Sequence, residues 1–356
     1  MTKTGPLPAV DTAKAKATID KGRRANWWKR IGRGGPRSKY CHCDGGELSK
    51  ASDLERIAAL AIPPAWKFVR VNPATHGKIQ AVGMDSAGRV QYIYDPAFAA
   101  KQQRKKFEKI ERFGALLPGL RRKANEDIDL HGLPCAKVLA VAIKLIDKLY
   151  FRVGADGSAR DFKTYGLTTL QKRHLSIGRK GRLRFEFVGK GHVQQQKVLI
   201  DHELAAVFNE MRSLGRGRKL FRFINDDGKP AAIKPAQINS YIKASLGAES
   251  SAKDFRTWGA TVVAAAEFAS IGKCEEPAEI KKNVVKVVRR VAAELGNTPS
   301  VCRSSYIHPA VIEAYESGLV IDESRSRRLR KSARSTNGLG PEEKALIRLL
   351  DRVHSV

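Results

Sequence analysis

The spacing of the apolar residues changes near Asp95-Pro96, and this change constrains the fold more than any other feature of the chain. Before it, the runs 68–71, 78–82 and 90–94 are short, and Asn-Pro and Ser-Ala-Gly turns separate them, which is typical of strands. After it, a strongly basic segment over 98–113 begins a series of segments with the 3.6-residue period of helices. The pattern predicts an α+β protein in which a small β-rich N-terminal module precedes a mainly α-helical domain.

The length of the chain and its turn residues divide it further. A chain of 356 residues is longer than a single core usually becomes, so we expect more than one domain. We expect a mobile or loosely docked basic arm over 1–50, the β-rich module over 51–110, a helical domain over 111–320, and a basic tail over 321–356 with a short helix. Inside the helical domain, apolar residues alternate over 183–187, which predicts a strand that pairs with 193–200 in a short β-hairpin sheet.

The charge of the chain points to its partner. Lys and Arg number 66 against 36 Asp and Glu, a formal net charge of +30, which favours a polyanion such as nucleic acid or an anionic lipid surface. Apolar stretches such as 138–146 are broken by charge and fall short of the roughly 20 residues that a membrane span needs. The first residues lack an apolar signal segment, and five cysteines fit a reducing compartment. We therefore expect a cytoplasmic, nucleoid-associated protein without a membrane partner.

A tyrosine and several dispersed cations are the candidates for chemistry. Tyr306 follows a predicted helix that starts at Thr298 and Pro299. A free phenol titrates near pH 10, so a tyrosine nucleophile needs cations nearby, and the planar guanidinium fork binds two phosphate oxygens at once. Arg152 and Arg256 are arginines of this kind. Each residue alone also fits an ordinary packing or helix-end role, but together on so basic a chain they indicate phosphodiester transesterification.

Five phrases of the sequence occur in a fixed order: 61–66, 85–92, 165–170, 253–257 and 296–299 ahead of Tyr306. Together they resemble the small type IB DNA topoisomerases of bacteria and poxviruses, over about residues 40 to 320. The resemblance implies the fold shared by tyrosine recombinases and type IB topoisomerases. It also implies relaxation of supercoiled DNA by transient cleavage of one strand, strand rotation and religation.

The resemblance assigns a role to each reactive residue. Tyr306 attacks the scissile phosphate and forms a 3′-phosphotyrosyl ester, while Arg152 and Arg256 bind the transition-state oxygens. Lys190, at the predicted hairpin tip, protonates the leaving 5′ oxygen, and Lys253 assists this step. The ester keeps the energy of the broken bond, so the resemblance implies no ATP, no metal and no other cofactor. The sequence accordingly contains no G-x-x-x-x-G-K-[ST] nucleotide loop.

Two positions depart from the family pattern. Asn297 stands nine residues before Tyr306, where the poxviral pattern has histidine, and its amide can donate one hydrogen bond but carries no charge. Ser158 stands in an Asp-Gly-Ser turn where the family often has an aromatic residue. The resemblance therefore includes Asn297 in the catalytic set and leaves open how far these two changes alter the rate.

The resemblance also implies DNA contacts in the N-terminal module, at Arg89, Gln91, Tyr92 and Tyr94. Strand alternation places Tyr92 and Tyr94 on one face, which fits either DNA contact or burial in the core of the module. Trp27 and its neighbour Trp28 also allow two roles, stacking on bases or anchoring the arm. We expect the protein to act as a monomer that clamps double-stranded DNA.

Two other functions compete with this interpretation. A tyrosine recombinase uses the same chemistry, but such enzymes typically carry His-x-x-Arg where this chain has Lys253-x-x-Arg256. A noncatalytic basic DNA-packing protein would explain the charge but not the ordered set of reactive residues.

Overall fold

The computed structural model describes residues 12–32, 34–35, 38–321 and 337–354. The chain forms two compact units that divide between Lys106 and Phe107. This division lies inside helix α3 (Pro96–Ile128), a few residues before position 110, where the sequence analysis places the boundary. Each unit has its own core, and each is described separately below.

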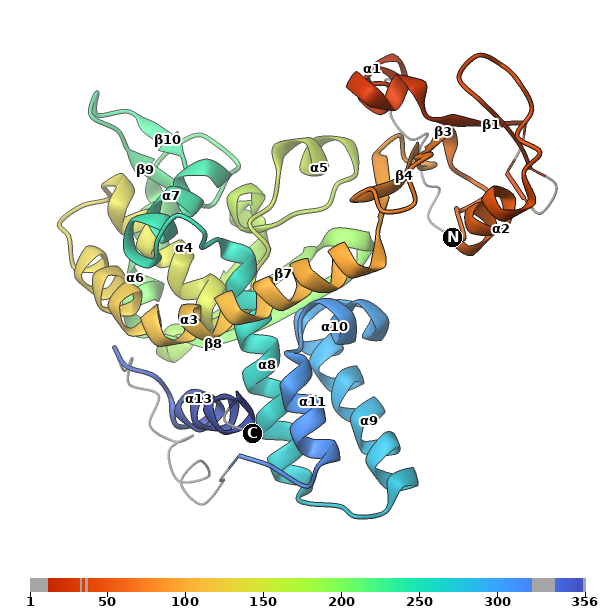
Figure 1. The fold of residues 1–356 in the computed structure, drawn as a ribbon. Coiled ribbons are helices and arrows are strands. Elements are labelled where there is room, and N and C mark those ends of the chain that lie inside the picture. The colour runs from red at the N-terminus through yellow and green to blue at the C-terminus, as the bar shows by residue number, and fades with distance from the viewer. Residues whose placement is uncertain (1–11, 33, 36–37, 322–336, 355–356) are drawn as a thin grey trace, which may run out of the picture. The chain divides into compact units, whose positions relative to one another are not determined.

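The N-terminal unit is built on an antiparallel five-stranded sheet of order β2-β1-β3-β4-β5 (Figure 1). Its strands are β1 (Trp28–Ile31), β2 (Lys39–Cys41), β3 (Lys67–Val71), β4 (Ile79–Met84) and β5 (Val90–Tyr94). The unit also contains two helices, α1 (Thr12–Ile19) and α2 (Ala51–Ala59). The three strands predicted in this region are therefore confirmed as β3, β4 and β5.

Two strands of this sheet, β1 and β2, come from the expected basic arm. Trp28 begins β1 and is only 7% exposed, and it packs with Val69 and Val71 in the core of the unit. The guanidinium carbon of Arg56 lies 5.2 Å from the ring centroid of Trp28, a cation–π contact. The described residues between 12 and 48 thus differ from a loosely docked arm, because several of their apolar side chains are part of the core. Residues 1–11 lie outside the described part of the chain.

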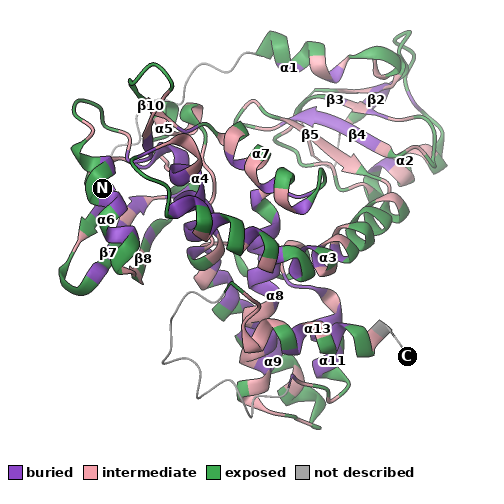
Figure 2. Ribbon diagram, turned by 90° about the vertical axis from the view of Figure 1, so that its left-hand side faces the viewer, coloured by how far each residue is buried: buried purple, intermediate pink, exposed green. Residues whose placement is uncertain are grey.

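The C-terminal unit is mainly helical and has one large contiguous core. Beyond α3, its helices are α4 (Cys135–Leu149), α5 (Asp156–Asp161), α6 (His202–Ser213), α7 (Pro235–Leu246), α8 (Ala252–Ile271), α9 (Pro277–Leu295), α10 (Pro299–Ser305), α11 (Pro309–Glu316) and α13 (Pro341–His354). Helix α8 is central, since it packs against α4, α9, α11 and α13. Figure 2 shows that buried residues are concentrated along α4 and α8. The prediction of an α+β fold is confirmed.

Two small antiparallel sheets complete this unit. The strands β6 (Leu175–Ile177), β7 (Arg182–Val188) and β8 (Gln194–Ile200) form a sheet in that order. The strands β9 (Arg222–Ile224) and β10 (Pro230–Ala232) pair across the irregular stretch between them. In the β7–β8 ladder Phe187 faces Gln195 and Leu183 faces Leu199, which confirms the predicted hairpin.

The C-terminal helix α13 belongs to the core of the second unit. Leu346, Leu349 and Leu350 are each at most 5% exposed. The short helix predicted within 321–356 is confirmed and starts at Pro341, but its leucines pack it into the core of the unit and it is not part of a free tail. An Arg- and Ser-rich run of the sequence, 324–335, lies outside the described residues.

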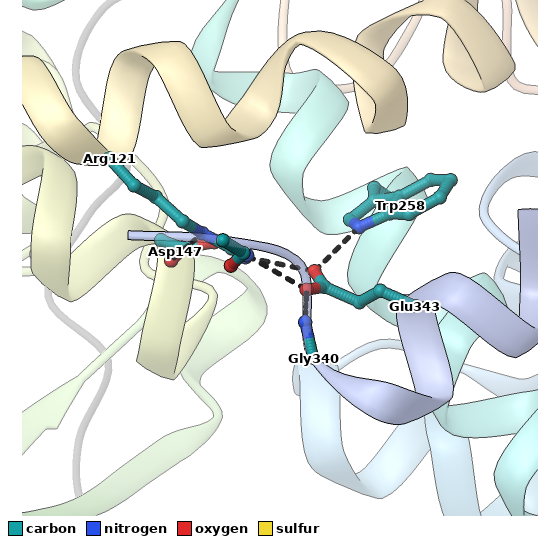
Figure 3. A network of polar contacts seen from close by, with 6 residues as sticks. Arg121, Asp147, Trp258, Gly340 and Glu343 are labelled. Atoms are coloured by element: carbon teal, nitrogen blue, oxygen red, sulfur yellow. Dashed lines mark hydrogen bonds and ion pairs between the residues drawn. The ribbon is translucent and has the colours of Figure 1, made fainter. Parts of the chain in front are cut away.

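A buried ionic network fixes α13 to α3, α4 and α8 (Figure 3). Arg121 of α3 donates through Nη2 to Asp147 of α4 at 2.9 Å and through Nη1 to Glu343 of α13 at 2.8 Å. Glu343 also accepts from the indole Nε1 of Trp258 in α8 at 2.9 Å. Because the three charged side chains are at most 13% exposed, each depends on its partners for compensation of its charge.

Candidate active site

Tyr306 lies immediately after α10. The hydroxyl of Thr298 accepts from the amide of Val301 at 3.4 Å, and Pro299 occupies the first helical position, as predicted. The amide of Tyr306 donates to the carbonyl oxygen of Cys302 at 2.9 Å, which ends the helix. The ring of Tyr306 is half-buried against the core of the unit.

Two arginines from distant segments meet at the turn that joins α9 to α10. Nη2 of Arg152 donates to the carbonyl oxygen of Gly296 at 2.9 Å and also to Oδ1 of Asn297. Nη2 of Arg256 donates to the carbonyl oxygen of Leu295 at 2.9 Å and to the same Oδ1 of Asn297 at 3.3 Å. The structure therefore brings together Arg152, Arg256 and Asn297, which the sequence analysis selected.

The backbone of the turn explains how Asn297 reaches this position. Helix α9 ends at Leu295 and is capped by Gly296, which has φ +62° and ψ +49°, a left-handed conformation that costs glycine little. The amide of Asn297 then donates back to the carbonyl oxygen of Ala292 at 2.9 Å. This glycine cap directs the next side chain toward the two guanidinium groups.

Arg256 also contacts Tyr306 directly. Its guanidinium carbon lies 5.3 Å from the centroid of the Tyr306 ring. Nη1 of Arg256 donates to the carbonyl oxygen of Tyr150, the residue at which α4 ends. Arg256 is 4% exposed, and among the described residues neither its Nε atom nor Nδ2 of Asn297 has a hydrogen-bond partner. Two buried donors are thus available to a ligand beside the tyrosine ring.

The electrostatics of the cluster follow from its burial. Burial, with the charge of Arg152 as the second cause, lowers the pKa of Arg256 to about 10, while Tyr306 opposes this shift. Burial also lowers the pKa of Arg152, again opposed by Tyr306. Both guanidinium groups remain charged at neutral pH. Two desolvated cations beside one phenol create a site that favours an anionic ligand.

Thr261 attaches the main chain around Tyr306 to α8, and the sequence analysis missed it. The hydroxyl of Thr261 lies 3.3 Å from the carbonyl oxygen of Tyr306 and 2.8 Å from that of Thr257. It also accepts from the amide of His308 at 3.1 Å. The helix that carries Arg256 therefore also anchors the tyrosine. No motif marks Thr261, because its partners near Tyr306 lie about 45 positions away in the chain.

The two candidate lysines lie on exposed surfaces of the same unit. Lys190 occupies the tip of the β7–β8 hairpin, where the amide of Gly189 donates to the carbonyl oxygen of Val193 at 2.8 Å. Lys253 lies in the first turn of α8. Within the described residues, no hydrogen bond or ion pair joins either lysine to the Arg152, Arg256 and Asn297 cluster.

Ser158 lies in a short helix rather than in the expected turn. Helix α5 spans Asp156–Asp161, and the carbonyl oxygen of Ser158 accepts from the amides of Phe162 at 3.1 Å and Thr164 at 3.3 Å. The main chain of Ser158 thus closes the end of α5.

The candidate DNA-binding residues of the N-terminal unit lie on and beside β5. Nε of Arg89 and Nε2 of Gln91 each donate to Oδ2 of Asp85 at 2.9 Å. The rings of Tyr92 and Tyr94 stack with centroids 6.1 Å apart, so the two do share a face. Tyr92 packs against the small apolar cluster beneath α1, whereas Tyr94 is 46% exposed. Of the two tyrosines, Tyr94 offers the larger accessible surface.

Two further searches cover the described residues only. None of their helices is long and apolar enough to cross a membrane. Within the same residues, no three His, Cys, Asp or Glu side chains group as metal ligands would.

Comparison with known proteins places the chain in a family. Residues 95–333 match the family described as Eukaryotic DNA topoisomerase I, catalytic core, and residues 38–85 match Bacterial DNA topoisomerase IB, N-terminal domain. DNA topoisomerase 1B of Acanthamoeba polyphaga mimivirus is 30% identical over 284 residues, which cover 78% of this chain and 84% of that protein. DNA topoisomerase 1B of Vaccinia virus is 23% identical over 238 residues, or 65% and 71% of the two chains. The chain belongs to the type IB DNA topoisomerase family.

Proposed function

We propose that Tyr306 is the nucleophile with which this topoisomerase cleaves one strand of DNA. Its phenolic oxygen attacks the scissile phosphorus, the bond from phosphorus to the 5′ oxygen breaks, and a 3′-phosphotyrosyl ester forms. The observation that carries the proposal is the position of Arg256, which lies over the Tyr306 ring and shares Asn297 with Arg152. Two fixed cations beside the phenol favour phenolate and stabilise the charge of the phosphorane.

Arg152, Arg256 and Asn297 bind the nonbridging oxygens. The backbone oxygens of Leu295 and Gly296 hold both guanidinium groups, so these groups need little reorganisation when charge develops. Nε of Arg256 and Nδ2 of Asn297 are buried donors without partners among the described residues. An anionic oxygen that accepts from both would satisfy them.

Lys190 supplies the proton that the departing 5′ oxygen needs, and Lys253 assists this step. An exposed ammonium at a hairpin tip can enter a DNA groove, and Lys253 lies three positions before Arg256 on α8. The free 5′ hydroxyl later attacks the ester and reseals the strand, after the free end has rotated. Because the ester conserves the bond energy, the cycle needs neither ATP nor a metal.

The partner is double-stranded DNA, which the enzyme clamps as a monomer in the cytoplasm, at the nucleoid. The net charge of +30 supports strong binding to the phosphate backbone. In the N-terminal unit, Tyr94, Gln91 and Arg89 on and beside β5 contact the groove and backbone, and Tyr92 supports Tyr94 from within the stack. The matches to topoisomerases argue against both a recombinase and a noncatalytic packing protein.

The test is relaxation of supercoiled plasmid in chelator without ATP, followed by a detergent quench to trap covalent protein. The parent is expected to give relaxed circles and a covalent adduct, whereas Tyr306→Phe gives neither and still binds DNA. Tyr165→Phe is the matched control, since Tyr165 is a partly buried tyrosine of the same core. An adduct formed by purified Tyr306→Phe would assign the nucleophile to another tyrosine, and relaxation without paired recombination sites separates a topoisomerase from a recombinase.

A further inference from the structure

The β7–β8 hairpin, which carries Lys190, is fastened to the end of α9 by a buried lysine. Nζ of Lys197 in β8 donates to the carbonyl oxygen of Glu294 at 2.5 Å and lies 3.4 Å from the Oε1 atom of the same residue. The Lys197 side chain is only 13% exposed. Glu294 lies in the last turn of α9, three residues before Asn297. The contact therefore joins the hairpin to the turn that holds the arginines.

Gln195, two residues before Lys197, fills the space between the hairpin tip and the same turn. It is 8% exposed. A Cβ atom placed on Gly189 would lie 2.9 Å from Cγ of Gln195, and one placed on Gly296 would lie 2.5 Å from its Nε2 atom. The neighbour of Lys190 thus touches Gln195, and Gln195 touches the residue whose carbonyl oxygen binds Arg152.

The surroundings of Lys197 indicate a specific role for its charge. Burial lowers the pKa of Lys197, Glu294 opposes this, and Arg256 and Arg152 add to the lowering. The ammonium group of Lys197 therefore lies near two other cations. Only its bonds to Glu294, at the C-terminal end of α9, favour its charged form. The ion pair of Arg184 on β7 differs from that of Lys197. Arg184 is half-exposed and bonds to Glu186 of its own strand at 2.7 Å.

We propose that Lys197 is a positioning residue for protonation of the leaving group: its bond to Glu294 holds the hairpin so that Lys190 reaches the 5′ oxygen. This rests on the proposed role of Lys190 as the general acid. The tip itself is exposed and lacks polar bonds from Lys190 to the cluster, so β8 must set its position. Without the bond, β7 and β8 remain paired, but the position of the hairpin relative to α9 is no longer fixed.

The experiment measures single-turnover cleavage of two duplexes, one with the normal 5′ oxygen and one with sulfur in that bridging position. A thiolate leaves without a proton, so only steps other than protonation limit the second duplex. Lys197→Met is expected to slow cleavage of the oxygen duplex about 10- to 100-fold, a part of the roughly 10²- to 10⁴-fold that general acid catalysis contributes, and to cleave the sulfur duplex at close to the parental rate. The double variant Lys197→Met with Lys190→Ala should be no slower than Lys190→Ala alone, because both act on one step.

Three further variants separate positioning from general damage. Gln195→Ala, on the same chain of contacts, should show the same recovery with sulfur, and Lys197→Arg should retain most of the parental rate. Arg184→Ala is the matched control for loss of a hairpin cation, and it should cleave both duplexes like the parent. Equal defects of Lys197→Met on both duplexes, or additive defects in the double variant, would overturn the positioning role. A defect of Lys190→Ala that sulfur does not relieve would instead refute the role of Lys190 in the proposed function.

Discussion

Asn297 and Arg256 are joined through Oδ1 of Asn297, which accepts from Nη2 of Arg256 at 3.3 Å. Arg152 donates to the same oxygen. Because the two arginines occupy the acceptor end of the amide, its Nδ2 donor is directed away from them and has no partner among the described residues. An asparagine at this position thus does two things: it aligns the arginines and it presents a neutral donor.

Substitution of Asn297 separates these two roles. Asn297→Ala should cost roughly 1 to 3 kcal/mol of transition-state stabilisation, the value of a buried hydrogen bond. Asn297→Asp should be slower still, because a carboxylate pairs with both arginines, repels phosphate and cannot donate. Asn297→His should keep or raise activity, since a ring nitrogen can donate in the same place. Single-turnover cleavage at fixed salt measures all three, and an aspartate variant as fast as the parent would contradict the assigned donor.

Loss of either arginine should slow cleavage and religation together. Arg152→Ala or Arg256→Ala is expected to reduce both rates by about 10² to 10⁵, as for other preorganised donors at phosphoryl centres. Lysine should rescue Arg256 poorly, because a single ammonium nitrogen cannot copy the planar fork whose two Nη atoms bond to Tyr150, Leu295 and Asn297. Arg179→Ala, at an exposed position, controls for the loss of one charge. Near-normal single-turnover rates in an alanine variant would remove that arginine from the site.

Gly296→Ala tests whether the turn between α9 and α10 matters for cleavage, and Gly318→Ala is the matched control. Gly296 and Gly318 have φ +62° and +77°, so alanine is strained at both. A Cβ atom at Gly318 meets nothing within 4 Å, whereas at Gly296 it meets Gln195 at 2.5 Å. Both variants should therefore lose similar stability to urea, but only Gly296→Ala should also lose at least about tenfold in cleavage rate, or ~1.4 kcal/mol. Equal cleavage rates in the two folded variants would show that the Gln195 contact is unimportant.

Removal of Glu343 should destabilise the catalytic unit. Glu343→Ala leaves Arg121 buried with only Asp147 as a carboxylate partner and leaves the indole of Trp258 without its acceptor. Breaking a buried ion pair on one side costs about 3 to 5 kcal/mol, so the melting temperature should fall by several degrees. Glu313→Ala, at an exposed position on α11, is the control and should melt like the parent. An unchanged melting temperature of Glu343→Ala would show that the leucines alone hold α13.

His174 should make stability depend on pH. Its Nδ1 atom accepts from the amide of Gln171 at 3.1 Å, and burial, followed by the charge of Arg173, lowers the pKa of His174 from 6.5 to about 4. The unfolded chain therefore takes up the proton first as the pH falls. The stabilising contribution is complete above about pH 6.5 and is lost as the pH drops toward 4.

The comparison variant is His174→Asn, which keeps a side-chain acceptor but does not titrate. Between pH 6.5 and 4, the free energy of unfolding in urea should fall more steeply for the parent than for this variant. Parallel curves over that window would mean that His174 is not held neutral by the fold.

Features that a few neighbouring residues encode could be predicted before the fold was known. The change of apolar period gave the order of strands and helices, the glycines around Lys190 gave a hairpin, and Thr298 with Pro299 gave the start of α10. The kinds of side chain in the candidate site could also be predicted, because a nucleophile, a phosphate-binding cation and a general acid each need a particular side chain. The assignment of Arg152 and Arg256 to the candidate site followed from the resemblance, because local spacing does not distinguish them from other arginines.

The distant segments that support the site became visible only in the folded chain. Trp28 joins the sheet of the first unit, and the leucines of α13 complete the core of the second, although both lie in segments dominated by charge. Lys197 meets Glu294 across 97 positions of the chain. Such contacts depend on how separately formed helices and hairpins pack and exclude water, and periodicity within one segment carries no information about the partner segment.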